Sequence, residues 1–181
     1  MRRRLLLGMA AVGFCVMAAS RGSLADPLTV VQAANVNSLA DVRSALLQGD
    51  NPDRVDDNGR AALSYAAAAG NSEMVTLLLE HGAHVDVRDR AGNTPLHEAA
   101  ESGSLSVIQS LADAKATIDA QNRQGVTPLM RATDRRKVPA VRLLLERGAD
   151  PKQQDFTGRD AVGWAAGQPA LLTLLRNAKP R

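Results

Sequence analysis

The sequence has 181 residues and a formal net charge of +3, with 45% hydrophobic but only 2% aromatic residues. A chain of this length forms one domain of ordinary size, and its apolar content comes from Ala and Leu, which favours closely packed helices over a sheet. The scarcity of aromatic rings argues against a nucleic-acid-binding surface that stacks bases.

Residues 1–25 have the pattern of a secretory signal peptide. Three arginines at 2–4 precede an apolar run from Leu5 to Ala19, which is shorter than the roughly 20 residues of a membrane-spanning helix. Small residues at 23 and 25 predict cleavage after Ala25, with a site near Ala19 as the second choice. The alternatives are an uncleaved membrane anchor, a twin-arginine export signal and lipidation at Cys15.

Cleavage after residue 25 changes the charge balance. Residues 26–181 carry 18 basic and 19 acidic side chains and no cysteine, which leaves no overall basic footprint for nucleic acid and no disulfide framework. We therefore expect a protein that binds no nucleic acid, is not held at the membrane and is a monomer. We place it in the periplasm, with secretion from the cell as the second choice.

From residue 26 onward the chain repeats with a fixed period. Glycines at 59, 92, 125 and 158 are evenly spaced, and alanines at 66, 99, 132 and 165 keep the same interval. A period of about 33 residues is typical of helical units that stack. In one unit we expect Thr94 to be the N-cap of a helix, Pro95 to be its first residue and Gly103 to end it in a left-handed conformation.

The segments TPLHEAA at 94–100 and TPLMRAT at 127–133 resemble the ankyrin repeat, as do LLLEHGAHVD at 77–86 and LLLERGADPK at 143–152. Diverged copies read AALSYAA at 61–67 and DAVGWAA at 160–166. The resemblance implies an all-α repeat solenoid in which each ankyrin repeat is a helix–turn–helix with a β-hairpin-like loop. It implies about five repeats, caps included, at 26–53, 54–86, 87–119, 120–152 and 153–181, and a structural role for His97 in bracing its turn.

Three residues stand where other repeats have a turn glycine. These are Asn37, Lys115 and Arg136. Asn tolerates the left-handed conformation of a turn glycine best after Gly itself, and a left-handed backbone at Lys115 would cost about 1 kcal/mol. Pro139 is expected in the first turn of the following helix, where it is tolerated.

No pattern in the chain indicates catalysis. His81 and His84 have the spacing H-x-x-H, but two ligands without a cysteine or carboxylate partner are too few for a metal site. Asp56 and Asp57 are interpreted as loop formers, since Asp stabilises turns. The sequence therefore predicts no enzyme, no cofactor and no metal.

Partners of ankyrin-repeat proteins usually meet the hairpin tips and the exposed side of the first helices, which together form a concave face. Glu98 would project from its helix on this side, and Asp57 and Trp164 also fall at such positions. By this resemblance we predict a partner-binding surface made of Arg60, Tyr65, Arg88, Arg90, Asn93, Glu98, Glu101, Arg123, Arg131, Arg135, Arg136, Lys137 and Phe156.

The charge distribution adds a prediction about the partner. Residues 26–101 have a net charge of −7 and residues 102–181 a net charge of +6. A basic cluster in the fourth repeat contributes to the second value: Arg131, Arg135, Arg136, Lys137 and Arg142. We expect this cluster to bind an acidic protein surface.

The resulting interpretation is an exported, non-enzymatic protein-binding adaptor. Small exported bacterial ankyrin proteins include some that assist a periplasmic catalase, so this resemblance leaves open an accessory or carrier role, such as haem delivery. His81, His84 and Tyr65 would be the available haem donors. A secreted, host-directed effector is the other alternative.

Overall fold

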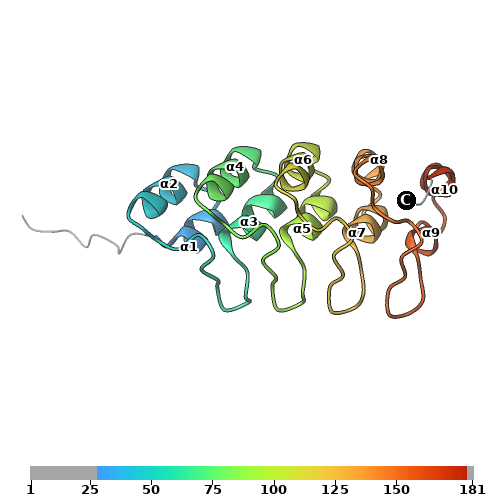
Figure 1. Cartoon of the computed structure of the whole chain (residues 1–181), viewed down its shortest axis with the longest axis horizontal. Helices are drawn as coiled ribbons and strands as arrows, with labels where there is room; N and C mark the ends of the chain where they lie inside the picture. Colours follow the sequence, from blue (N-terminus) through green and yellow to red (C-terminus); the bar gives the residue numbers. More distant parts are fainter. Residues whose placement is uncertain (1–27, 179–181) are drawn as a thin grey trace, which may run out of the picture.

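The computed structural model describes residues 28–178, so the expected signal peptide at 1–25 lies outside the described residues. Within 28–178, ten helices follow one another as five pairs (Figure 1). The pairs are α1 (Val30–Asn35) with α2 (Leu39–Leu47), α3 (Ala62–Ala69) with α4 (Ser72–Glu80), α5 (Pro95–Ser102) with α6 (Leu105–Asp113), α7 (Pro128–Asp134) with α8 (Val138–Glu146), and α9 (Ala161–Trp164) with α10 (Pro169–Asn177).

The pairs stack side by side into two rows of helices. The odd-numbered helices form one row and the even-numbered helices the other, and the long loops between pairs project together beyond the odd-numbered row (Figure 1). The evenly spaced alanines at 66, 99, 132 and 165 are all completely buried. Their small side chains let neighbouring helices approach closely, so one core runs the length of the stack, as the sequence predicts for a repeat solenoid. No helix of residues 28–178 is long and apolar enough to span a membrane.

The helix α5 begins and ends as its residues predict. Thr94 is its N-cap, Pro95 its first residue, and Gly103 follows it with φ +80°. Thr94 and His97 form a capping box, and the Thr94 hydroxyl also lies 2.9 Å from His97 Nδ1, because the histidine folds back onto the N-cap.

The three residues that replace turn glycines are all left-handed. Asn37 has φ +55°, Lys115 has φ +69° and Arg136 has φ +56°. The turns at these positions keep the geometry of the glycine turns although the side chains carry a Cβ. The chain therefore tolerates backbone strain at these three residues, and the helix pairs keep the same register along the stack.

The four loops between pairs share one turn with Asp or Asn at its first position and Gly at its fourth. In the first loop, Asp56 Oδ1 accepts from the N–H groups of Asn58 (2.8 Å) and Arg60 (2.9 Å). This confirms Asp56 as a loop former, while Asp57 at the tip is exposed. The loops are hairpin-like without regular strands: residues 28–178 contain a single isolated bridge, between Val55 and Ala61.

Candidate protein-binding surface

The second residues of the four turns form a row that we call the tip row: Asp57, Arg90, Arg123 and Phe156. The backbone N–H of each of the last three donates to a carbonyl oxygen of the preceding tip at 3.0–3.1 Å. All four side chains are exposed, and Phe156 retains 72% of its accessible surface. Two arginines and an aromatic ring are therefore presented to solvent from a hydrogen-bonded backbone.

The tip glycines allow this close spacing. A methyl group on Gly125 would lie 2.7 Å from both the backbone nitrogen and the ring of Phe156, and one on Gly92 would lie 3.0 Å from the backbone nitrogen of Arg123. Both glycines also have positive φ, at +78° and +81°. A side chain at either position would push adjacent tips apart, so glycine keeps the tip row continuous.

Two side chains tie the loops together just before the tips. Arg88 Nη1 donates to the carbonyl oxygens of Gly92 (3.1 Å) and Gln121 (2.8 Å). Gln121 Nε2 repeats this arrangement one unit later, with the carbonyl oxygens of Gly125 (3.1 Å) and Gln154 (3.0 Å). Arg88 was predicted as a partner contact, but its side chain holds the loops in register.

A hollow of about 310 Å³ opens between the later loops. Arg123 and Phe156 of the tip row line it, so the exposed ring borders a recess rather than a flat surface. Its lining is Arg88, Asp89, Gly92, Gln121, Asn122, Arg123 and Phe156.

The odd-numbered helices α3, α5, α7 and α9 contribute a second row, which we call the helix column: Tyr65, Glu98, Arg131 and Trp164. In its middle, α5 pairs with both neighbours. Glu98 Oε2 accepts from Arg60 Nη2 at 3.0 Å on one side, and Glu101 lies 3.6 Å from Arg131 Nε on the other. Glu98 thus projects from its helix toward Arg60 and not into solvent, and only 18% of its side chain is exposed. Burial, partly offset by Arg60, raises the pKa of Glu98.

His97 on the same helix joins two units. Its Nε2 lies 2.9 Å from the carbonyl oxygen of Val126, which can only accept, so Nε2 carries the proton and Nδ1 accepts from the Thr94 N–H at 3.1 Å. The side chain is 1% exposed, and burial lowers the pKa of His97 to about 4, with the positive charge of Arg131 acting in the same direction. The bracing role predicted for His97 is confirmed, and it extends across to the next loop.

The helix column ends in two matching clusters that we call brackets. In the first bracket, Arg60 stacks on Tyr65 with its guanidinium carbon 4.3 Å from the ring centre, and the Tyr65 hydroxyl donates to Asp56 at 2.5 Å. Burial acts to raise the pKa of Asp56, but the hydrogen bonds from Tyr65 and two backbone N–H groups outweigh it and leave that pKa lowered.

The second bracket repeats the first three periods further along the chain. Arg159 stacks on Trp164 at 4.2 Å from the ring centre, and the indole Nε1 donates to Asp155 Oδ2 at 3.0 Å. The Thr157 hydroxyl donates to Asp155 Oδ1 at 2.6 Å, and this bond is the largest cause that lowers the pKa of Asp155 to about 2.

A family comparison agrees with this geometry. The family described as "Ankyrin repeats (3 copies)" matches residues 30–122, which is more than half of the chain, and "Ankyrin repeat" matches residues 124–156. The chain belongs to the ankyrin-repeat family. Ankyrin repeats generally mediate protein–protein interaction and the family is typically non-catalytic. No curated protein matches the chain.

The basic cluster predicted in the fourth ankyrin repeat is divided in the structure. Arg131 and Arg135 both pair with Glu101, the latter through a 2.9 Å hydrogen bond from its Nε. Arg136 is exposed in its left-handed turn, whereas the Lys137 methylenes pack against Gly103. Arg142 lies on α8, in the other row of helices. These residues belong to several surfaces, because successive positions in a tight turn point in different directions.

Asn93 is another predicted contact that the ankyrin stack uses internally. Its Oδ1 accepts from Asn122 Nδ2 at 2.9 Å and from Arg131 Nη2 at 3.4 Å, so it connects two loops and a helix. Of the thirteen predicted contact residues, five are exposed and outside any ion pair among residues 28–178: Arg88, Arg90, Arg123, Arg136 and Phe156. Of these, Arg88 is already bonded to the carbonyl oxygens of two loops.

Arg159 was absent from the predicted surface although it lies in the second bracket. The signal that would have found it is the spacing of Asp56, Arg60 and Tyr65, which returns three periods later as Asp155, Arg159 and Trp164. The pattern is hidden because the two intervening ankyrin repeats carry other residues at the arginine and aromatic positions.

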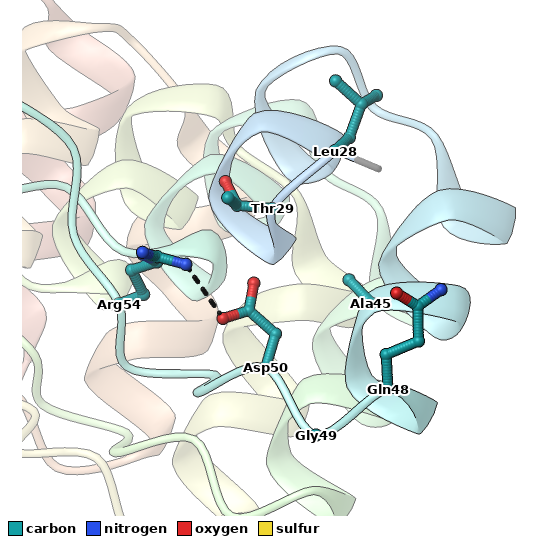
Figure 2. Close-up of a pocket in the computed structure, with 7 residues that line it drawn as sticks. All are labelled: Leu28, Thr29, Ala45, Gln48, Gly49, Asp50 and Arg54. Atoms are coloured by element: carbon teal, nitrogen blue, oxygen red, sulfur yellow. Dashed lines mark hydrogen bonds and ion pairs between the residues drawn. The ribbon is translucent and has the colours of Figure 1, made fainter. Parts of the chain in front are cut away.

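Two further places on the molecule are weaker candidates for a functional site. A hollow of about 300 Å³ at the first helix pair (Figure 2) is lined by Leu28, Thr29, Ala45, Gln48, Gly49, Asp50 and Arg54. Its two charged side chains pair with each other at 3.2 Å, and Asp50 also accepts from the Val30 N–H. His81 and His84 are exposed, and residues 28–178 contain no group of three metal-binding side chains.

Proposed function

We propose that this protein is an exported, monomeric, non-enzymatic adaptor that binds a protein partner in the periplasm through its tip row and helix column. The observation that carries the proposal is the tip row: Arg90, Arg123 and Phe156 are exposed on a backbone that hydrogen bonds hold from one repeat to the next. Arginine and aromatic side chains dominate the binding energy of protein interfaces, and a rigid array loses little freedom when it binds.

We expect the binding surface of the partner to carry acidic residues around an apolar residue. The half of the sequence from residue 102 has a net charge of +6, which attracts an acidic surface over a distance. Since Glu101 already neutralises part of the fourth-repeat cluster, the direct contacts come from Arg90, Arg123 and Arg136. Phe156 supplies the apolar contact beside the hollow between the loops.

The compartment rests on residues 1–25, whose basic and apolar segments have the signal-peptide pattern. Fractionation of cells that produce the full chain, followed by N-terminal sequencing, tests it. A periplasmic protein beginning at Asp26 is the expected result. An intact N-terminus in the membrane or the cytoplasm would contradict export.

Affinity capture from a native periplasmic extract tests the adaptor function. Tagged protein is expected to retain one acidic protein that elutes at high salt, and the triple variant Arg90→Gln/Arg123→Gln/Phe156→Ala is expected to lose it. A matched variant, Arg43→Gln/Arg142→Gln, changes two exposed arginines on the even-numbered helices and should retain it.

Retention by the triple variant would reject the tip row as the binding surface. Recovery of a bound chromophore or metal with no protein would contradict the adaptor and favour a carrier. Analytical ultracentrifugation of the purified protein checks the monomer.

A further inference from the structure

We propose that the second bracket, Asp155, Arg159 and Trp164, is a receptor for a carboxylate side chain of the protein partner, and that Phe156 contacts an apolar residue beside that carboxylate. This inference rests on the proposed function, since it names the chemistry of the partner. The partner segment it specifies contains Glu or Asp next to an aliphatic or aromatic residue.

The first bracket shows how such a carboxylate is held. Arg60 is stacked on Tyr65, and its Nη2 donates to Glu98 of the next repeat at 3.0 Å. The arginine side chain is 25% exposed and the glutamate side chain 18% exposed. A stacked arginine in this setting therefore receives a carboxylate from a neighbouring unit.

The second bracket has the same parts, but its arginine is open. Arg159 is 52% exposed, compared with 25% for Arg60. Its side-chain hydrogen bond and ion pair with described residues both use Nε, which donates to the Thr157 hydroxyl at 3.0 Å and lies 3.4 Å from Asp155. No hydrogen bond joins its two terminal nitrogens to another residue of 28–178. These are the groups that bind a carboxylate in a two-pronged manner.

Stacking on Trp164 prepares Arg159 for this contact. The ring holds the guanidinium plane, while the bond from the indole nitrogen to Asp155 fixes the ring itself. A pre-oriented arginine loses less side-chain freedom when it binds than a free one. The negative charge of Asp155 does not prevent Arg159 from binding a second carboxylate. In the first bracket, Asp56 takes the place of Asp155, and Arg60 there still pairs with the carboxylate of Glu98.

Phe156 completes the surface from the same turn. It precedes Arg159 by three residues, and its ring packs over Gly125 of the preceding tip while 72% of the residue remains exposed. An apolar ring beside an open guanidinium fits an acidic segment that also carries an apolar side chain. The charge of +6 in this half of the sequence brings such a segment to the site.

Trp164 is the single tryptophan of the sequence, so its fluorescence and its indole N–H resonance report on this bracket alone. The probe is a capped hexapeptide with two glutamates between two leucines, and the control peptide has glutamines in their place. The glutamate peptide is expected to shift both Trp164 signals and to bind at least about tenfold more tightly than the glutamine peptide.

Arg159→Gln should weaken binding of the glutamate peptide by about tenfold, and Arg159→Lys should restore only part of it, because lysine keeps the charge but not the planar fork. Arg142→Gln, which removes the same charge from α8, should bind as the wild type does. Equal affinity for the two peptides, or unchanged binding by Arg159→Gln, would overturn the proposal.

Capture of the native partner separates the two proposals. If the tip-row triple variant loses the partner while Arg159→Gln retains it, the adaptor function stands and the carboxylate receptor is rejected. If neither variant loses the partner, the proposed binding surface itself fails. Self-association that Arg159→Gln abolishes would also overturn this inference, since the carboxylate would then come from a second copy of the chain.

Discussion

The α5–α6 pair and the α9–α10 pair use their polar side chains in opposite ways. On α5, His97, Glu98 and Glu101 each bond to a neighbouring repeat, and the first two are largely buried there. Around α9, Arg159 and Trp164 bond within their own loop and helix. Equivalent positions of a repeat thus hold the stack together where a neighbouring repeat covers them and are exposed where no residue of 28–178 covers them.

The two brackets make this difference specific. Both contain a carboxylate, a stacked arginine and an aromatic ring with a polar hydrogen. What separates them is Glu98, which the next repeat places on Arg60. The surrounding repeat, and not the bracket, decides whether the arginine stabilises the fold or faces solvent.

The largest effect is expected at His97. Its pKa in the folded chain is about 4, below the ordinary value of 6.5, so as pH falls below 6.5 the unfolded chain takes up a proton that the folded chain does not. Stability is therefore unaffected by this group above pH 6.5 and falls by about 3 kcal/mol between pH 6.5 and pH 4. Urea unfolding at several pH values measures this loss.

The control for His97 is His97→Met, since methionine occupies the equivalent position 130 on α7. Carboxyl groups titrate in both proteins, so the difference between their pH profiles isolates the histidine. The variant should be less stable at pH 7, having lost the bond to Val126, and should show a flatter profile from pH 6.5 to pH 4. Parallel profiles would show that His97 does not carry the pH dependence.

The next effect separates the two brackets. Glu98→Ala leaves Arg60 partly buried without its main counter-ion and is expected to cost about 2 kcal/mol of unfolding free energy. Arg159→Ala should cost much less, because the guanidinium is half exposed and its ion pair is screened by water. Urea unfolding at pH 7 compares them, and equal losses would refute the distinction between a covered and an open bracket.

A smaller gain is expected where the middle pair ends. Lys115 has φ +69° after α6, so Lys115→Gly should raise the unfolding free energy by about 0.5–1 kcal/mol. Lys115→Ala keeps a Cβ and should give no such gain. Thermal unfolding of both variants measures the strain, and a gain with alanine would mean that the lysine side chain itself is unfavourable.

The smallest effect is expected at Ser64, which holds the place of His97 on α3. Its hydroxyl is buried and makes no hydrogen bond with the described residues. Ser64→Ala should raise stability by about 0.5 kcal/mol, because a buried unpaired hydroxyl costs free energy that a methyl group does not. Chemical denaturation resolves this gain, and a clear loss of stability would indicate that the hydroxyl has a partner.

The sequence alone was sufficient for the repeat, the helix caps and the turn positions. Each of these depends on residues close together in the chain or on a regular spacing along it: the N-cap at Thr94, the turn glycines and the fixed repeat interval. Arg90, Arg123 and Phe156 were predicted as contact residues from the resemblance to the ankyrin repeat, and their exposure has a local cause, because the position within a turn determines which side chain points outward.

The pairing of charges was decided by the tertiary structure. Glu98 and Glu101 pair with arginines of the neighbouring repeats. These ion pairs neutralise three positive charges that a partner could otherwise bind, those of Arg60, Arg131 and Arg135. The spacing of a repeat places such residues on one face, but stacking brings the side chains within reach and determines which are covered. For the same physical reason Arg159, which has the sequence context of Arg60, became identifiable as an open site only once the packing of neighbouring repeats was known.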